Sequence, residues 1–202
     1  MTKTFIHPTS IVGTKKIGEG TYIGPFCNIS ERVVIGKNCR LVGWSSIGNP
    51  GEFKIPPKDN GNPIIIEDGV EIREFVTINT PMGDITKVGK DNYLMTKSHV
   101  GHDSILENDV VLSCGSLVGG CSYIGRHCYL GLNASTHQYA ELGAYSILGA
   151  NSFFKGKSPM GITWAGVPAR PIKINLRNIN LNAPLEKRQI IIDEAAIFIG
   201  GR

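Results

Sequence analysis

The segment KSHVGHDSIL, residues 97–106, places two histidines three positions apart and an aspartate directly after the second. His102 with Asp103 could act as a general base with its orienting carboxylate, because imidazole changes charge near neutral pH. His99 and His102 could instead be two ligands of a metal ion. Both could also be polar residues of a solvent-exposed turn. The segment alone does not distinguish these three interpretations. The secondary-structure elements that position it must therefore be predicted first.

Aliphatic residues recur every six residues through most of the chain, often followed by glycine, as in IGEGTYIGPFCN. This period fits neither a helix nor a simple amphipathic strand, but it is typical of a hexapeptide β-helix, in which three hexads form one coil. Small residues such as Cys27 and Cys128 recur four positions later and fill the core. We expect the glycines at turns that need unusual backbone angles. The repeat therefore predicts an all-β solenoid, a parallel β-helix with an aliphatic core.

Two interruptions divide this repeat. Residues 49–63 and residues 79–87 leave the six-residue frame and are predicted to be loops, which on a rigid solenoid often carry function. Residues 1–155 form the predicted repeat domain. Residues 156–202 form a C-terminal extension, in which APLEKRQIIIDEAAIFI predicts a short terminal helix.

An 18-residue coil turns the sequence into geometry, because residues 18 apart stack about 4.8 Å apart on neighbouring coils. His102 then stacks on Gly120 and Gln138, and Asp103 stacks on Cys121. Thr136 is the one polar residue of the aliphatic ladder and lies beside His137. Chemically capable residues therefore gather on one face: His99, His102, Asp103, Gly120, Cys121, His137 and Gln138. A shared face favours a site over unrelated surface histidines.

Composition excludes several classes of protein. The 21 basic and 17 acidic side chains give a net charge of +4 without a long basic run, so neither a nucleic-acid nor a membrane surface is expected. A modest positive charge suits a phosphate-bearing small molecule. The absence of a signal sequence or long apolar stretch predicts a cytoplasmic protein with no membrane span. Five cysteines without a C-x-x-C pair predict neither a disulfide framework nor a zinc knuckle.

Several motifs resemble one known family. The segments FIHPTS, IREFVTIN, TKVGKDNYLM, SHVGHDSIL, STHQYAELG and GVPARP are similar to the UDP-N-acetylglucosamine O-acyltransferases of lipid A synthesis, within the hexapeptide-repeat acyltransferases. The similarity runs from about residue 5 to residue 180. It implies a left-handed β-helix, whereas crossovers between parallel strands are usually right-handed. It also implies a homotrimer with active sites between the β-helices of neighbouring subunits.

The resemblance also implies roles for individual residues. His102 matches the general base, Asp103 its partner carboxylate, and Gly120 the backbone N–H that binds the oxyanion. The implied substrate-binding residues are Glu52, Lys54, His99, His137, Gln138, Ala150 and Asn175. No metal and no bound cofactor are implied. Four positions depart from the family: Glu52 replaces an aspartate, Cys121 a histidine, Leu181 an arginine, and Ala150 a glycine that leaves room for a long acyl chain.

The resemblance implies an acyltransferase that moves an acyl or hydroxyacyl group from an acyl carrier protein thioester to a hydroxyl of a nucleotide sugar such as UDP-N-acetylglucosamine. A coenzyme A-dependent N-acyl- or acetyltransferase for surface polysaccharide is the alternative, and Ala150, Leu181 and a short C-terminal region favour it. A zinc-dependent γ-type carbonic anhydrase and a non-catalytic scaffold are more remote. Cys121 as a nucleophile is a further possibility for the chemistry.

Overall fold

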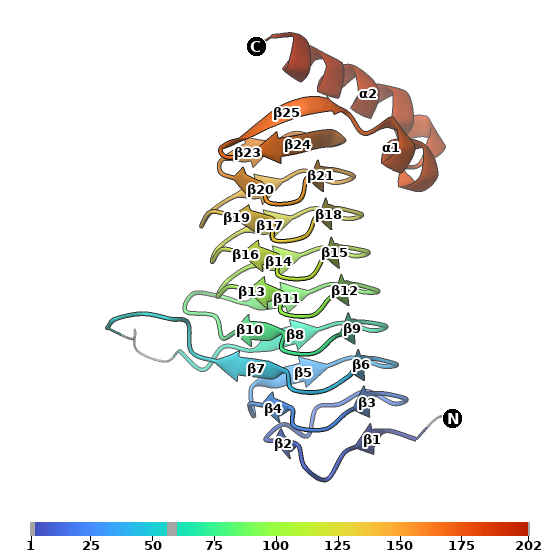
Figure 1. Cartoon of the computed structure of the whole chain (residues 1–202). Coiled ribbons are helices and arrows are strands. Elements are labelled where there is room, and N and C mark those ends of the chain that lie inside the picture. The colour runs from blue at the N-terminus through green and yellow to red at the C-terminus, as the bar shows by residue number, and fades with distance from the viewer. Residues whose placement is uncertain (1–2, 56–59, 202) are drawn as a thin grey trace.

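The computed structural model describes residues 3–55 and 60–201, which form a parallel β-helix followed by two helices (Figure 1). Short strands stack into three sheets, which we call A, B and C. The predicted solenoid of hexapeptide repeats with a C-terminal helical tail is therefore confirmed. Residues 56–59 of the predicted loop 49–63 lie outside the described residues, as do residues 1–2 and 202.

The strands of the three sheets follow one another in the order A, B, C along most of the chain. Sheet A contains β1 (Phe5–Ile6), β3 (Tyr22–Ile23), β6 (Arg40–Leu41), β9 (Glu71–Ile72), β12 (Tyr93–Leu94), β15 (Val111–Leu112), β18 (Tyr129–Leu130), β21 (Ile147–Leu148), β24 (Ile162–Gly166) and β25 (Ala169–Ile174). Sheet B contains β2 (Ile11–Val12), β4 (Asn28–Ile29), β7 (Ser46–Asn49), β10 (Thr77–Asn79), β13 (His99–Val100), β16 (Leu117–Val118), β19 (Ser135–Thr136) and β22 (Phe153–Phe154). Sheet C contains β5 (Val33–Ile35), β8 (Ile64–Ile66), β11 (Thr86–Val88), β14 (Ile105–Leu106), β17 (Tyr123–Ile124), β20 (Glu141–Leu142) and β23 (Lys157–Ser158).

The 18-residue stacking predicted from the repeat is present in the register. His99 pairs with Leu117, and Leu117 pairs with Ser135. From Ile23 onward the inward residue of each hexad is almost completely buried, as Val100 and Val118 are, whereas Phe5 and Ile11 in the first coil are 46% and 72% exposed. Burying such a side chain stabilises the fold by about 1.5–3 kcal/mol. The core is thus a set of aliphatic ladders, and the turns at the corners are free to carry other residues.

The predicted reason for the recurrent glycines is wrong at most positions. Left-handed backbone angles occur mainly at the third residue after the aliphatic one, as at Asp103 (φ 58°) and Cys121 (φ 57°), whereas Gly48 (φ 96°) is an exception. The glycine directly after the aliphatic residue instead permits close approach of the next coil. A Cβ atom on Gly101 would lie 2.6 Å from the backbone nitrogen of Gly120. Tight stacking of coils, rather than φ, requires these glycines.

Two loops project from the same corner of the solenoid, between sheets B and C (Figure 1). The first loop follows β7, and its described part is residues 50–55 and 60–63; the second loop follows β10 and occupies residues 80–85. His102 and Asp103 lie one coil further along, at the corner after β13. Both interruptions of the repeat therefore reach the corner that carries the histidine–aspartate pair.

The C-terminal extension continues the coil before it becomes helical. Strand β24 pairs parallel with β21, and β25 then turns back antiparallel to β24. Helices α1 (Leu176–Asn182) and α2 (Leu185–Gly200) follow, where one short helix was expected, and α2 buries Ile191 and Ala195 against the solenoid end (Figure 1). Within residues 3–55 and 60–201, no helix has the length and apolarity needed to span a membrane.

Candidate active site

The His102 and Asp103 side chains form a nearly buried pair at the corner between sheets B and C. Nδ1 of His102 lies 2.8 Å from Oδ2 of Asp103, and the side chains are 12% and 14% exposed. A carboxylate can only accept a hydrogen bond, so the shared proton resides on Nδ1. The lone pair of neutral His102 is then on Nε2. This atom is buried and has no hydrogen-bond partner among the described residues, so it is available to accept a proton.

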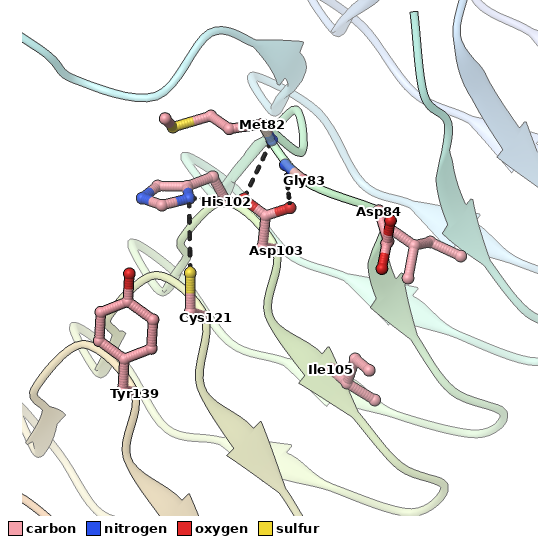
Figure 2. A pocket seen from close by; sticks show the side chains of 9 residues that line it. Met82, Gly83, Asp84, His102, Asp103, Ile105, Cys121 and Tyr139 are labelled. Atoms are coloured by element: carbon pink, nitrogen blue, oxygen red, sulfur yellow. Dashed lines mark hydrogen bonds and ion pairs between the residues drawn. The ribbon is translucent and has the colours of Figure 1, made fainter. Parts of the chain in front are cut away.

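The second loop holds the carboxylate of Asp103, and Thr86 of β11 holds its backbone. Oδ1 accepts a hydrogen bond from the Gly83 N–H at 2.7 Å, and Oδ2 accepts one from the Met82 N–H at 3.0 Å (Figure 2). The Asp103 backbone N–H donates to Oγ1 of Thr86 at 2.8 Å. The second loop therefore clamps the carboxylate that orients His102.

Gly120 lies directly against the free nitrogen of His102. A Cβ atom on Gly120 would overlap Nε2. No hydrogen bond among the described residues uses the Gly120 N–H. Because Gly101 has no side chain, no Cβ atom covers the Gly120 nitrogen. The neighbouring Gly119 N–H donates to both the carbonyl oxygen and Oγ1 of Thr136, each at 3.2 Å. The polar break in the aliphatic ladder thus holds the backbone beside an unpaired N–H donor, which is the kind of group that stabilises an oxyanion.

His102 borders two cavities. The smaller, of about 230 Å³, has mainly polar walls and is lined by Glu52, Phe53, Asn79, His99, Gly101, His102, Gly119, Gly120 and Gln138. The larger, of about 540 Å³, is more apolar and is lined by Met82, Gly83, Asp84, Ile85, His102, Asp103, Ile105, Cys121 and Tyr139 (Figure 2). One imidazole therefore has access to two binding spaces of different character.

His99 is a neutral hydrogen-bonding residue in the smaller cavity. Burial lowers its pKa, the carboxylate of Glu52 opposes this shift, and nearby His102 adds to it. Nδ1 of His99 lies 2.7 Å from the Thr77 hydroxyl. An imidazole in this state suits contact with a neutral polar ligand group better than with an anion.

Cys121 does not have the surroundings of a nucleophile. Its Sγ atom lies 4.0 Å from Nδ1 of His102, the nitrogen already bonded to Asp103 (Figure 2). Burial raises the pKa of the thiol, a hydrogen bond with Tyr139 lowers it less, and Asp103 raises it further. The thiol is therefore protonated near neutral pH, where a nucleophile would need the thiolate.

One cluster of side chains has the residue types and the spacing that could hold a metal ion. Among the described residues, His102, Asp103 and Cys121 offer ligand atoms within 4.8 Å of one another. These residues fit a metal poorly, because Nδ1 and the carboxylate bond each other and the thiol is protonated.

The other predicted substrate-binding residues are scattered around this centre. Glu52 and Gln138 line the smaller cavity with His99. His137 is exposed, with Nδ1 3.0 Å from the Gln138 carbonyl, and Lys54 is an exposed residue of the first loop.

Two predicted residues lie elsewhere. Ala150 is exposed at the corner between sheets A and B. Asn175 is 6% exposed, and its side chain caps α1 and donates to the Tyr145 carbonyl at 2.8 Å. The structure therefore brings neither of them to His102 of the same chain.

Sequence patterns did not single out Phe53. Its ring centroid lies 5.0 Å from that of His102, with the planes at 54°. Phe53 stands between Glu52 and Lys54 in an aperiodic loop, so only its place beside these two residues could have pointed to it. It packs an apolar ring against the imidazole.

Comparison with known proteins adds independent evidence. Residues 14–49 match the family described as bacterial transferase hexapeptide (six repeats). An acyl-[acyl-carrier-protein]–UDP-N-acetylglucosamine O-acyltransferase of Burkholderia orbicola is 32% identical over 149 residues, 72% of this chain and 56% of the relative. The enzyme of that name from Burkholderia thailandensis is 34% identical over 144 residues, 69% and 54% of the two chains. The chain thus spans about half the length of these relatives.

Solved structures share the fold. A UDP-N-acetylglucosamine acyltransferase of Francisella novicida superposes with a TM-score of 0.82 at 22% identity, covering 96% of this chain and 77% of the other. The enzyme of that name from Bacteroides fragilis gives a TM-score of 0.77 at 24% identity, covering 96% and 82%. The resemblance indicated by the motifs is confirmed in sequence and in fold.

Proposed function

We propose that this chain is an acyltransferase that moves an acyl or hydroxyacyl group from an acyl carrier protein thioester to a hydroxyl of a nucleotide sugar such as UDP-N-acetylglucosamine, as in lipid A biosynthesis. The names of the sequence relatives support the reaction. The single observation that carries it is the position of His102, whose buried Nε2 has no partner among the described residues and lies against Gly120, a residue with an unpaired backbone N–H.

The reaction requires a base and an oxyanion donor. Nε2 of His102 takes the proton of the acceptor hydroxyl as its oxygen attacks the thioester carbonyl carbon. Asp103 keeps the other proton on Nδ1 and stabilises the imidazolium. The Gly120 N–H stabilises the negative charge on the carbonyl oxygen. The C–S bond then breaks, and the imidazolium gives its proton to the leaving thiolate. The C–O bond formed with the sugar replaces the C–S bond of the thioester.

The two cavities suit different parts of the substrates. We assign the polar cavity with Glu52, His99 and Gln138 to the sugar, and the apolar cavity with Met82 and Tyr139 to the acyl thioester. We assign Lys54, an exposed residue of the same loop as Glu52, and exposed His137 to a phosphate of the nucleotide. We do not assign Asn175 to the nucleotide, because its buried amide is used in the helix cap.

A homotrimer is part of the proposal. Ala150 and His102 lie at different corners of one prism, so Ala150 can line an acyl groove at His102 only if a second copy contributes it. Sedimentation velocity at micromolar concentration should give three times the 21.9 kDa chain mass. A stable monomer there would contradict a site shared between subunits.

The experiment that tests the reaction uses the purified protein with a panel of acyl donors and acceptors. Acyl carrier protein and coenzyme A thioesters of several lengths are combined with UDP-N-acetylglucosamine and with a UDP-amino sugar, and products are identified by mass spectrometry. An O-acylated nucleotide sugar formed from the carrier protein thioester is the expected product. An N-acylated product formed from coenzyme A would favour the alternative, and bicarbonate formation dependent on zinc would contradict acyl transfer.

A further inference from the structure

The first loop reaches across to the second through two asparagine side chains. Nδ2 of Asn60 donates to the carbonyl oxygens of Met82 and Gly83, at 2.6 and 2.5 Å. Nδ2 of Asn62 also donates to the Gly83 carbonyl, at 2.6 Å. Residues 20 or more positions apart in the sequence are thereby fastened together beside the active site.

The orientation of the Asn60 amide is fixed within the loop. Its Oδ1 atom accepts a hydrogen bond from the backbone N–H of Asn62 at 2.9 Å. The oxygen is therefore turned toward its own loop, and the two N–H groups of the amide face the second loop. Asn60 thus presents donors to the carbonyls of residues 82 and 83 and cannot present its acceptor there.

One of these bonds, from Asn60 to the Met82 carbonyl, ends on the peptide group that holds Asp103. The Met82 carbonyl and the Gly83 N–H belong to one planar peptide unit. The carbonyl accepts from Asn60, and the N–H donates to Oδ1 of Asp103 at 2.7 Å. Gly83 is the residue that permits this approach, since a Cβ atom there would lie 3.0 Å from Oδ1.

A continuous chain of hydrogen bonds follows. It runs from the Asn60 amide through the peptide between residues 82 and 83 to Oδ1 of Asp103, and from Oδ2 of the same carboxylate to Nδ1 of His102 at 2.8 Å. Hydrogen bonds in such chains polarise one another, so a donor to the carbonyl strengthens the N–H on the other side of the peptide. Outer partners of this kind also fix the direction of the groups they hold.

We propose that Asn60 is a positioning residue, which holds the Asp103 carboxylate in line with His102 by way of the Met82–Gly83 peptide. Asn62 assists it by bonding the Gly83 carbonyl with its side chain and the Asn60 amide oxygen with its backbone N–H. Neither asparagine is among the residues that line the two cavities; they bond the carbonyls of Met82 and Gly83, which line the larger one. Their effect on catalysis rests on the proposed function, whereas their effect on the His102–Asp103 hydrogen bond does not.

The kinetic test is a double-mutant cycle. Asn60→Ala should lower kcat about fivefold, the factor that one net hydrogen bond supplies, and leave KM for the sugar nucleotide unchanged. Asn62→Ala should lower kcat less, because the bond from Asn60 to the Met82 carbonyl remains. In an Asp103→Ala background the Asn60→Ala change should not lower kcat further, because the chain of hydrogen bonds from Asn60 then no longer ends on a carboxylate. Full additivity would overturn the proposal.

A second measurement does not depend on turnover. In protein labelled with 15N-histidine, the Nδ1 proton of His102, identified by its loss in His102→Gln, should give a strongly downfield resonance through its bond to Asp103. Asn60→Ala should move this resonance upfield or broaden it by exchange with water. Asn133→Ala is the matched control, because this exposed asparagine lies at another corner and its side chain bonds Asn151 rather than any residue near His102 in the part of the chain that the structure describes. An unchanged His102 resonance in folded Asn60→Ala would overturn the proposal even if the enzyme proved to catalyse another reaction.

Discussion

Gly120 and His102 are placed so that a Cβ atom at residue 120 would overlap Nε2 of the imidazole. The contact involves the far end of a side chain rather than backbone, so the fold can accommodate a methyl group by moving His102. Gly120→Ala should therefore reduce kcat by a hundredfold or more while the thermal midpoint changes by only a few degrees.

Gly200→Ala provides the control for that change, because a Cβ atom there meets nothing within 4 Å. It should have wild-type kinetics. Wild-type turnover in Gly120→Ala would remove Gly120 from the active site, and a large loss of thermal stability would mean that the residue is required for packing instead.

The pKa of His99 predicts a pH dependence of folding stability. Burial lowers this pKa in the folded state below its ordinary value of 6.5. The unfolded chain therefore binds a proton more readily than the folded chain below about pH 6.5, and stability falls as the pH falls. His99→Gln should lose less stability than the wild type between pH 7.5 and 5.5, measured by denaturant unfolding at one protein concentration. Equal losses in the two proteins would contradict the assigned burial effect.

Cys121 should prove dispensable as a nucleophile. Its thiol pKa is raised by burial, so Cys121→Ser should keep at least a tenth of the wild-type kcat. Iodoacetamide at pH 7.5 should modify exposed Cys114 well before Cys121, as read by peptide mass spectrometry. Rapid labelling of Cys121 that is prevented by the acyl donor, together with an inactive serine variant, would support covalent catalysis and contradict this account.

Ala150 should influence acyl length if it lines the acyl groove of a neighbouring copy. Its methyl group would shorten the space, and each excluded CH₂ group forfeits about 0.8 kcal/mol of burial. Ala150→Gly should then shift kcat/KM toward longer thioesters without altering the choice of sugar. An identical length profile for both proteins, measured over a ladder of acyl donors, would show that Ala150 only occupies a corner of the solenoid.

The repeat allowed much of the fold and part of the site to be predicted. Strict six-residue spacing fixes which residues point inward, and the 18-residue coil placed His102 beside Gly120 without any knowledge of loops. The prediction that the repeat needs glycine after the aliphatic residue was correct, but the reason given was wrong. A six-residue period in the sequence does not show whether glycine is needed for a turn angle or for close stacking of coils.

The parts of the site outside the repeat could not be predicted in the same way. Thr77 lies beside His99 although they are 22 positions apart, because the second loop lengthens that coil. Phe53, Asn60 and Asn62 belong to a loop with no period, so their contacts with His102 and residues 82–83 depend on the folded path of the chain. The resemblance to the family predicted that Glu52 and Lys54 in the same loop bind substrate, but it did not predict where the neighbouring residues of the loop lie.

The kcat of His102→Ala tests the central claim most directly. His127→Ala is the matched control, because His127 also faces an aspartate, Asp109, at 3.8 Å, but at another corner of the solenoid. With the acyl carrier protein thioester and sugar nucleotide preferred by the wild type, His102→Ala should lower kcat by roughly 10² to 10⁴, the usual contribution of a general base. Asp103→Asn should cost less, and His127→Ala should keep wild-type turnover. Full turnover in folded His102→Ala would contradict the assignment of His102 as the base.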